Sequence, residues 1–405
     1  MLTGCQKDAN VEVDPSEKTF PIGLWVSPPL DQITMERYAE IKESGINFIS
    51  GFTEHLGGEK AIKQALDYAE ANGIKMLVRD PRLDALTEET MGELASIVSA
   101  YSDHPAYMGQ MVDDEPSMNE YKALAPLAEA YRKQVPGGIP FVNLFPTYAS
   151  LEQKGGDYRS YLDEYFDTYK PEVLSYDHYP FLKKAEDGTA GITEDYFYNL
   201  ELIRQKSLEQ SVPFWLFIQT LSFNNSHRDP SGEEILWQVY TSLAYGAKGI
   251  QYFTYWTPQS GAETFGPAMI DLDGNRTKHY DEVKSVNADI TRFASRLLDW
   301  TSLGVTHYPS NPPLIEATSA DTQVVSGIAG DAVIIGYFKD EDGNKKAIVV
   351  NGSYEKEAVT KLTLDPSIDK LTLWDEAEPR ETAVEDNRLT LNLAPGAGVL
   401  VEFWE

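Results

Sequence analysis

The chain has 405 residues, of which 64 are acidic and 34 are basic, so that its formal net charge is −30, and 42% of its residues are hydrophobic. This length is enough for one large domain and a smaller one. The acidic balance argues against nucleic acid and anionic membrane surfaces as partners, because both are bound through basic patches. An uncharged ligand is compatible with this composition.

The first residues resemble a lipidation signal. Leu2-Thr3-Gly4-Cys5 resembles the lipobox of bacterial lipoproteins, in which the cysteine becomes the lipidated first residue. Gln6-Lys7-Asp8 and the acidic stretch after it resemble the sorting signal of surface lipoproteins in the Bacteroidetes. We therefore expect residues 1–19 to form a disordered tether of an outer-membrane lipoprotein that faces the cell surface or periplasm. The alternative is an incidental free thiol on Cys5.

This signal would also be the sole link to a membrane. No apolar run in the sequence has the length needed to span a bilayer. A membrane partner is expected only through a lipid on Cys5, which is also the single cysteine and so forms no internal disulfide.

Strand and helix patterns alternate from residue 20 to about residue 300. Eight strand–helix repeats over this length predict a (β/α)8 barrel in residues 20–300. A doubly wound open sheet is the alternative, but no glycine-rich phosphate loop follows the first strand. The expected strands are Ile22–Ser27, Ile46–Gly51, Ile74–Arg79, Tyr107–Val112, Phe141–Phe145, Val173–Tyr176, Phe214–Thr220 and Gly249–Thr254. The expected helices are Met35–Ser44, Lys60–Asn72, Glu88–Tyr101, Ser117–Gln134, Tyr158–Tyr169, Glu194–Glu209, Gly232–Tyr245 and Lys278–Leu298.

From about Trp300 the pattern changes to short strands. Val333–Phe338 and Lys346–Val350 flank the turn sequence Asp340-Glu-Asp-Gly-Asn344, which predicts a hairpin. Residues 301–405 are therefore expected to form a small all-β sandwich that packs against the barrel. Further strands are expected at Lys361–Leu364, Lys370–Leu373, Leu389–Leu393 and Val399–Phe403.

Three consecutive carboxylates follow the fourth expected strand. Asp113, Asp114 and Glu115 precede Pro116, which opens a helical pattern. The carboxyl end of a buried parallel strand is where α/β folds bind ligands and carry out chemistry. Crowding of like charges raises the pKa of at least one carboxyl, which makes a proton donor near neutral pH. The alternative is a solvated acidic turn at the start of the next helix.

The other strand ends also carry polar or aromatic residues, and in a barrel they would face one cavity. Carboxylates and aromatic rings without a Cys/His cluster suit an uncharged, hydroxyl-rich ligand, so we expect a carbohydrate substrate and neither a cofactor nor a metal ion. His178 and His227 are isolated and are expected to form hydrogen bonds rather than to bind metal. Arg79 and Asp80 could alternatively form a structural ion pair. The residues expected to contact substrate are Trp25, Glu54, Arg79, Asp80, Asp113, Asn143, His178, Tyr179, Tyr255 and Trp256.

These motifs, in this order, resemble the clan A glycoside hydrolases, which are (β/α)8 enzymes. In that clan strand four ends in Asn-Glu-Pro, with the Glu as general acid/base, and this chain has Asp114-Glu115-Pro116. Strand eight of the clan carries a Trp under the sugar, which Trp256 matches. The segment from Ile270 to Asn287 is similar to the post-barrel segment of family 42-like β-galactosidases. The resemblance implies glycosidase activity with Glu115 as general acid/base.

One departure concerns the catalytic nucleophile. Strand seven of the clan ends in a second Glu, whereas this chain has Gln219. An amide cannot form the glycosyl ester. The second carboxylate could instead come from Asp177 or Glu54, with Glu263 more remote.

Three further explanations stay open. The mechanism could be substrate-assisted, in which case Asp114 orients a 2-acetamido group, Tyr179 holds its oxygen and Glu115 protonates the leaving oxygen. Alternatively the barrel binds glycan at the cell surface without catalysis, or Gln219 is an engineered replacement of the nucleophile.

Overall fold

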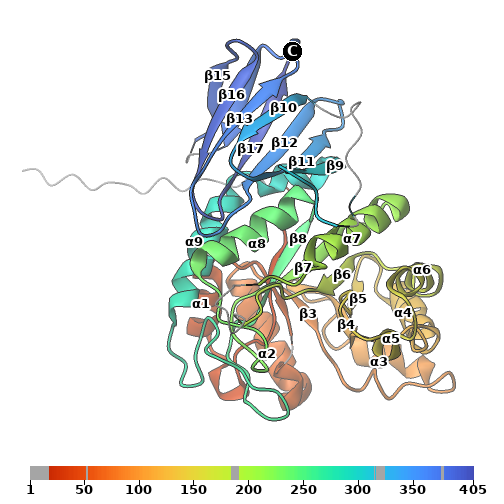
Figure 1. The fold of residues 1–405 in the computed structure, drawn as a ribbon. Coiled ribbons are helices and arrows are strands. Elements are labelled where there is room, and N and C mark those ends of the chain that lie inside the picture. The colour runs from red at the N-terminus through yellow and green to blue at the C-terminus, as the bar shows by residue number, and fades with distance from the viewer. Residues whose placement is uncertain (1–17, 52, 184–190, 314, 316–323, 375–377) are drawn as a thin grey trace, which may run out of the picture.

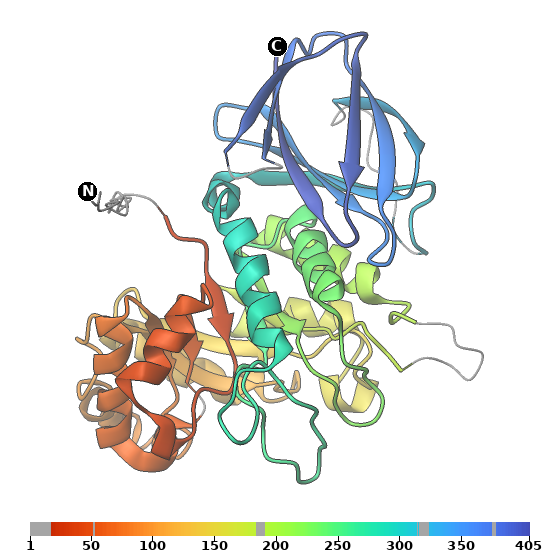
Figure 2. The same ribbon diagram turned by 90° about the vertical axis from the view of Figure 1, so that its left-hand side faces the viewer.

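The computed structural model describes residues 18–51, 53–183, 191–313, 315, 324–374 and 378–405. Cys5 and most of the expected tether lie outside these residues. The described chain forms an α/β barrel followed by a β-sandwich (Figures 1 and 2).

The barrel is closed and has eight parallel strands in the order β1 to β8, which confirms the predicted (β/α)8 architecture. Its strands begin and end within three residues of the expected positions. They are β1 (Ile22–Leu24), β2 (Phe48–Ser50), β3 (Lys75–Val78), β4 (Tyr107–Asp114), β5 (Ile139–Leu144), β6 (Leu174–Asp177), β7 (Phe214–Gln219) and β8 (Gly249–Phe253).

Aromatic side chains fill the lower part of the barrel interior. Trp215 packs against Phe48 and Phe141, with ring centroids 5.2 and 6.2 Å apart. Gly249 makes room for this ring, because a Cβ there would lie 2.6 Å from Trp215. The strand ends at the opposite mouth are therefore the part of the barrel that can hold a ligand.

The helices surround the barrel, and none that the structure describes is both long and apolar enough to cross a membrane. They are α1 (Met35–Glu43), α2 (Gly58–Ala71), α3 (Leu94–Val98), α4 (Tyr121–Gln134), α5 (Leu151–Lys154), α6 (Tyr158–Thr168), α7 (Tyr196–Gln210), α8 (Gly232–Ala244) and α9 (Lys278–Thr291). Short 3₁₀ turns are η1 (Leu30–Gln32), η2 (Glu54–Gly57), η3 (Met91–Glu93) and η4 (Ala294–Asp299).

The third expected helix is much shorter than Glu88–Tyr101. Thr87 and Thr90 hydrogen-bond to each other and to each other's backbone in a turn, which competes with helical hydrogen bonding. The regular helix begins only at Leu94.

The C-terminal region is an antiparallel sandwich, in agreement with the prediction. One sheet has the order β10-β13-β16 and the other the order β15-β14-β17-β12-β11-β9. Strands β9, β10 and β15 are irregular or short, and the sequence pattern does not predict them. The strands are β9 (Thr301–Tyr308), β10 (Val325–Gly330), β11 (Val333–Lys339), β12 (Lys345–Asn351), β13 (Ala358–Leu364), β14 (Lys370–Trp374), β15 (Arg380–Ala383), β16 (Arg388–Leu393) and β17 (Gly398–Trp404).

One face of the larger sheet forms part of the sandwich core, and its opposite face packs on the barrel. In β11, Val333 and Ile335 belong to the sandwich core, whereas Ile334 and Phe338 belong to the core of the barrel. This division follows the two-residue period of a strand. Gly336 lies so close to α8 that a Cβ there would be 1.9 Å from the carbonyl oxygen of Ala244. Figure 1 shows the sheet lying across α8.

Candidate active site

A cavity of about 600 Å³ opens at the carboxyl ends of the barrel strands. Its wall combines carboxylates from β4 and β6 with aromatic rings from several loops. The lining residues are Trp25, Val26, Asp114, Glu115, Asn143, Phe145, Pro146, Tyr148, Ala149, Gln153, Asp177, Tyr179, Phe217, Phe223, Asn224, His227, Phe253, Pro258, Glu263 and Phe265.

Three residues of this wall, Val26, Glu115 and Asn224, have left-handed backbone conformations. Glu115 has φ 55° and Val26 has φ 60°, values that are uncommon for residues with a Cβ and rarest for a β-branched one. The Glu115 amide donates to the carbonyl oxygen of Asn143 at 2.8 Å, and the Val26 carbonyl accepts from the amide of Trp256 at 3.1 Å. Such strained positions cluster at functional sites, where the surrounding structure enforces them.

Glu115 and Asp177 form the chemical centre of the cavity. Both carboxyl groups line the cavity and lie close enough for each to shift the pKa of the other. Burial, and then the negative charge of Asp114, raise the pKa of Glu115 to about 7. Burial, and then the charge of Glu115, raise the pKa of Asp177 well above its usual value. Because two adjacent buried carboxylates cannot both ionise cheaply, the charge on one opposes ionisation of the other and raises its pKa.

Asn143 on β5 connects Asp177 to the neighbouring carboxylate. Its side-chain NH₂ donates to Asp177 at 3.0 Å and to Asp114 at 3.3 Å. Asp114 is exposed to the open cavity, yet the surrounding protein, and then the charge of Asp113, raise its pKa to about 6. Asn143 therefore orients two carboxylates at once.

A chain of hydrogen bonds across the barrel interior fixes this amide. The Asn143 carbonyl oxygen accepts from the Ser175 hydroxyl at 2.9 Å, and that hydroxyl accepts from the Gln251 amide at 3.1 Å. The Gln251 carbonyl oxygen in turn accepts from Ser50 at 3.1 Å. Since each acceptor has a donor, the NH₂ of Asn143 is left to face the carboxylates.

Aromatic rings that the sequence analysis missed form most of the remaining wall. Phe223 and His227 stack with centroids 4.0 Å apart, and Tyr179 packs on Phe253 at 4.7 Å. Burial lowers the pKa of His227 to about 4, so its imidazole is neutral in the cavity. Most of these rings come from loops beyond the strand ends, a region for which strand patterns carry no positional signal. The missed aromatic residues of the wall are Phe145, Tyr148, Phe217, Phe223, His227, Phe253 and Phe265.

Gln219 does not reach the cavity. Its carbonyl oxygen accepts from the Phe181 amide at 3.1 Å, and its NH₂ donates to the carbonyl oxygens of Leu221 and Arg228 at 3.2 and 2.8 Å. The side chain is fully buried and serves to hold loop backbone. On β7 it is Phe217, in register with Asp177 of β6, that lines the cavity.

The structure also keeps four residues at the ends of β2, β3 and β4 out of the cavity. Glu54 is buried and accepts from the Tyr38 hydroxyl at 3.2 Å. Asp80 is buried against Arg82 at 2.6 Å, and Arg79 pairs with Asp84 at 2.9 Å. The side chain of Asp113 accepts from the backbone of Asp114 at 2.8 Å.

Three further expected contacts lie behind the wall. His178 is buried between the side chains of Asn199 and Thr193, at 2.9 and 2.6 Å. Tyr255 is fully buried, and the ring of Trp256 is covered by Arg37, whose guanidinium lies 5.2 Å from the ring centroid. Of the expected substrate contacts, Trp25, Asn143 and Tyr179 line the cavity.

Glu263 is a further carboxylate in the cavity wall, contributed by the loop after β8. It accepts from the amide of Asn224 at 2.7 Å and adds to the negative charge around Glu115. The described residues contain no group of three or more His, Cys, Asp or Glu side chains that could hold a metal ion.

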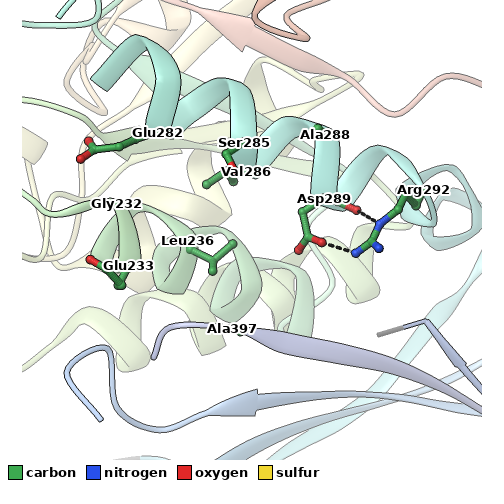
Figure 3. A pocket seen from close by; sticks show the side chains of 10 residues that line it. All are labelled: Gly232, Glu233, Leu236, Glu282, Ser285, Val286, Ala288, Asp289, Arg292 and Ala397. Atoms are coloured by element: carbon green, nitrogen blue, oxygen red, sulfur yellow. Dashed lines mark hydrogen bonds and ion pairs between the residues drawn. The ribbon is translucent and has the colours of Figure 1, made fainter. Parts of the chain in front are cut away.

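A second groove of about 610 Å³ lies on the outside of the barrel, between α8, α9 and the sandwich (Figure 3). Its charged residues include Asp289 and Arg292, which form an ion pair with each other. The groove has no aromatic ring in its wall and lies away from the strand ends. It therefore lacks the chemistry of the cavity.

Comparison with known families agrees with this location. The model of glycoside hydrolase family 42, described as β-galactosidase, matches residues 145–293, which run from the end of β5 through α9. This part of the chain is similar to that family. The match includes Asp177 and most of the aromatic wall. No curated protein matches the sequence.

Solved structures show the same fold. A catalytic mutant of a family 42 β-galactosidase from G. stearothermophilus is 10% identical, with a TM-score of 0.66 over 95% of this chain and 98% of its own. A family 5 glycoside hydrolase from Bacteroides vulgatus is 13% identical, with a TM-score of 0.59 over 95% and 89%. A β-galactosidase from Marinomonas ef1 is 12% identical, with a TM-score of 0.52, and the alignment covers 69% of this chain and 61% of that enzyme. The chain thus shares the barrel fold of these enzymes and spans less than two thirds of the Marinomonas enzyme.

Proposed function

We propose that the protein hydrolyses a glycosidic bond in an oligo- or polysaccharide, with Glu115 as general acid/base and Asp177 as the second carboxylate. The observation that carries this proposal is that the two carboxyls lie together in the wall of one cavity at the carboxyl ends of the strands. In the clan the nucleophile is a Glu at the end of strand seven. Here Asp177 would be the nucleophile, because the Gln219 side chain is an amide that hydrogen-bonds to backbone groups outside the cavity.

The proximity of the two carboxyls favours a retaining mechanism. Inverting glycosidases keep their carboxyls about 6.5–9.5 Å apart to admit a water molecule, whereas retaining enzymes keep them about 5–5.5 Å apart. Asp177 would attack the anomeric carbon while Glu115 donates its proton to the leaving oxygen. Water, deprotonated by Glu115, would then release the glycosyl ester and restore both groups.

β-Galactosides are the first substrates to test, because the matching family model is described as β-galactosidase. A panel of aryl glycosides that includes galactosides and 2-acetamido sugars would identify the sugar. Following the product anomers by NMR would distinguish retention from inversion. Hydrolysis confined to 2-acetamido sugars would instead favour the substrate-assisted route, for which Asp114 stands beside Glu115 in the wall.

The decisive variant is Glu115→Gln. Loss of the proton donor should lower kcat/KM by about 10²–10⁴ on substrates with poor leaving groups. Substrates with activated leaving groups should lose less, since they need little protonation. Unchanged turnover of the unactivated substrate would reject Glu115 as the acid. Binding of glycan without hydrolysis of any panel member by the wild-type protein would favour a non-catalytic glycan-binding role.

We also propose that the protein is an outer-membrane lipoprotein of a polysaccharide-utilising member of the Bacteroidetes, anchored through Cys5. The support for this is the sequence Leu2-Thr3-Gly4-Cys5 with its polar, acidic continuation. Expression in such a bacterium with an alkyne-tagged fatty acid should label the wild-type protein and not Cys5→Ala. Equal labelling of the two proteins would contradict lipidation at this residue.

A further inference from the structure

A second, smaller cavity adjoins the candidate active site. It has a volume of about 320 Å³ and shares Val26 and Pro258 with the larger one. These two residues therefore form a ridge between two neighbouring hollows at the same mouth of the barrel. The smaller cavity is lined by Val26, Ser27, Pro29, Asp31, Gln32, Thr53, Trp256, Thr257, Pro258, Gln259, Leu272 and Asp273.

The rim of this second cavity carries exposed polar groups. Asp31, Gln259 and Asp273 are exposed, and within the described chain no hydrogen bond or ion pair occupies their side chains. Gln32 lies beside them and accepts from Arg37 at 3.3 Å. Free carboxylate and amide groups of this kind can bind sugar hydroxyls by hydrogen bonds.

The ridge itself is held in a strained conformation. Val26 keeps its left-handed backbone while its carbonyl oxygen accepts from the amide of Trp256. Trp256 also lines the second cavity. The same strained contact thus joins the two hollows, so that a ligand crossing the ridge would touch both.

We propose that the second cavity is an additional sugar-binding subsite, so that the substrate is an oligosaccharide or polysaccharide chain that crosses the ridge formed by Val26 and Pro258. This proposal rests on the proposed function, because it assigns the larger cavity to the sugar that is cleaved. The polar rim binds the hydroxyls of the further sugar units. Short glycosides fill only the larger cavity and gain nothing from the second.

The test uses the Glu115→Gln protein, which leaves the glycan uncleaved. Calorimetric titration with β-1,4-galactobiose, -triose and -tetraose, or with the matching series of whichever sugar the wild type hydrolyses, gives Kd as a function of length. We expect Kd to fall at least about tenfold at the length that crosses the ridge. In protein that also carries Asp31→Ala and Gln259→Ala this gain should shrink to less than about threefold. Both replaced residues are exposed, so folding is expected to be intact.

Asn392→Ala provides a matched control. Asn392 is an exposed amide on β16 of the sandwich, and its removal should leave the length dependence intact. A Kd that does not change with length, absence of binding by every oligosaccharide, or a full gain in the double variant would overturn the subsite. Failure of the proposed function would be distinct, because the wild type would then cleave nothing while the length-dependent Kd persisted.

Discussion

The carboxylates in the two halves of the barrel mouth have different partners. On the side of β4, β5 and β6, Glu115 and Asp177 meet in a cavity, and their partner is the amide of Asn143. On the side of β3, the buried carboxylate of Asp80 is paired with Arg82 at 2.6 Å and with the Tyr101 hydroxyl at 3.1 Å. Both halves supply acidic residues at strand ends, and only one leaves them chemically available.

The pKa directions follow this division. Burial opposes ionisation of Asp80, but hydrogen bonds and the charge of Arg82 bring its pKa below the usual value. The pKa values of Glu115 and Asp177 are raised, because burial meets no compensating cation. A raised carboxyl pKa fits a proton donor, whereas a lowered one fits a structural ion pair.

The largest expected effect is that of Asp177→Asn. If Asp177 is the nucleophile, kcat/KM should fall by about 10³–10⁵, since an amide cannot form the glycosyl ester. Asp113→Asn is the matched control, because Asp113 lies outside the cavity wall, and its loss should change activity less than about fivefold. Steady-state kinetics on an activated glycoside measures both. Equal losses of kcat/KM in the two variants would contradict the assignment of Asp177, and not Asp113, to the reaction.

The second prediction concerns pH. Glu115 must be protonated to act as an acid, and its pKa of about 7 places the fall in kcat/KM on the alkaline side of about pH 7, tenfold per unit. On the acid side, a second proton on the pair removes the ionised nucleophile. Because the pKa of Asp177 is also raised, this limb should begin above its usual value of 3.8. A profile that is flat between pH 5 and 9 would contradict these raised pKa values.

A smaller effect is expected from Ser175→Ala, which breaks the hydrogen-bond chain behind Asn143. Without the Ser175 hydroxyl the amide can turn its carbonyl oxygen towards Asp177. We expect kcat to fall by about tenfold, and the acid limb to move to higher pH because Asp177 loses a donor that lowers its pKa. In Ser242→Ala, a buried hydroxyl on α8 is removed with no link to the site, so the pH profile should stay unchanged. Coincident profiles for Ser175→Ala and the wild type would show that the chain does not position the carboxylate.

The smallest effect on activity is expected from Arg82→Ala on the other half of the mouth. This change leaves Asp80 buried without its cation and should lower the free energy of unfolding by about 1–2 kcal/mol, a value reduced because the Arg82 side chain is 45% exposed. The folded-state pKa of Asp80 lies below 3.8, so the lost stability should be present above that pH and vanish as the pH falls further. Urea unfolding at pH 7 and pH 3 measures this difference, with exposed Arg159→Ala as control. A lower kcat/KM in folded Arg82→Ala protein than in Arg159→Ala protein, measured where both are fully folded, would place Asp80 in the site after all.

The architecture was accessible from the sequence, because eight apolar runs with intervening helical periods admit few arrangements. Glu115 and Asp177 were found at strand ends by the same logic, and the structure joins them. Glu54, Asp80 and Trp256 follow strands equally well, but their partners Tyr38, Arg82 and Arg37 come from outside those strands. The strand pattern does not predict whether a residue from another segment will pair with the side chain at a strand end and keep it out of the cavity.

The aromatic wall was inaccessible for a different reason. Phe223 and His227 lie in the loop after β7, and Phe265 lies in the loop after β8. Phe223 forms backbone bridges with both His227 and Phe265, so the two loops fold on each other rather than follow a periodic pattern. Gln219 was singled out because of its place on strand seven, and only the loop contacts made by its side chain reveal its structural task.

The larger sandwich sheet has one consequence for how the molecule could be divided. Alternate residues of β11 and β12 serve two different cores, with Ile348 and Val350 facing the barrel and Ala347 and Val349 facing the sandwich. Cutting the chain near Trp300 would uncover the apolar surface of α8 that the sheet covers. It would also expose Ile348 and Val350 on the face of the isolated sheet that had packed on the barrel. The protein should therefore melt in a single transition, and neither half should survive as a separate soluble module.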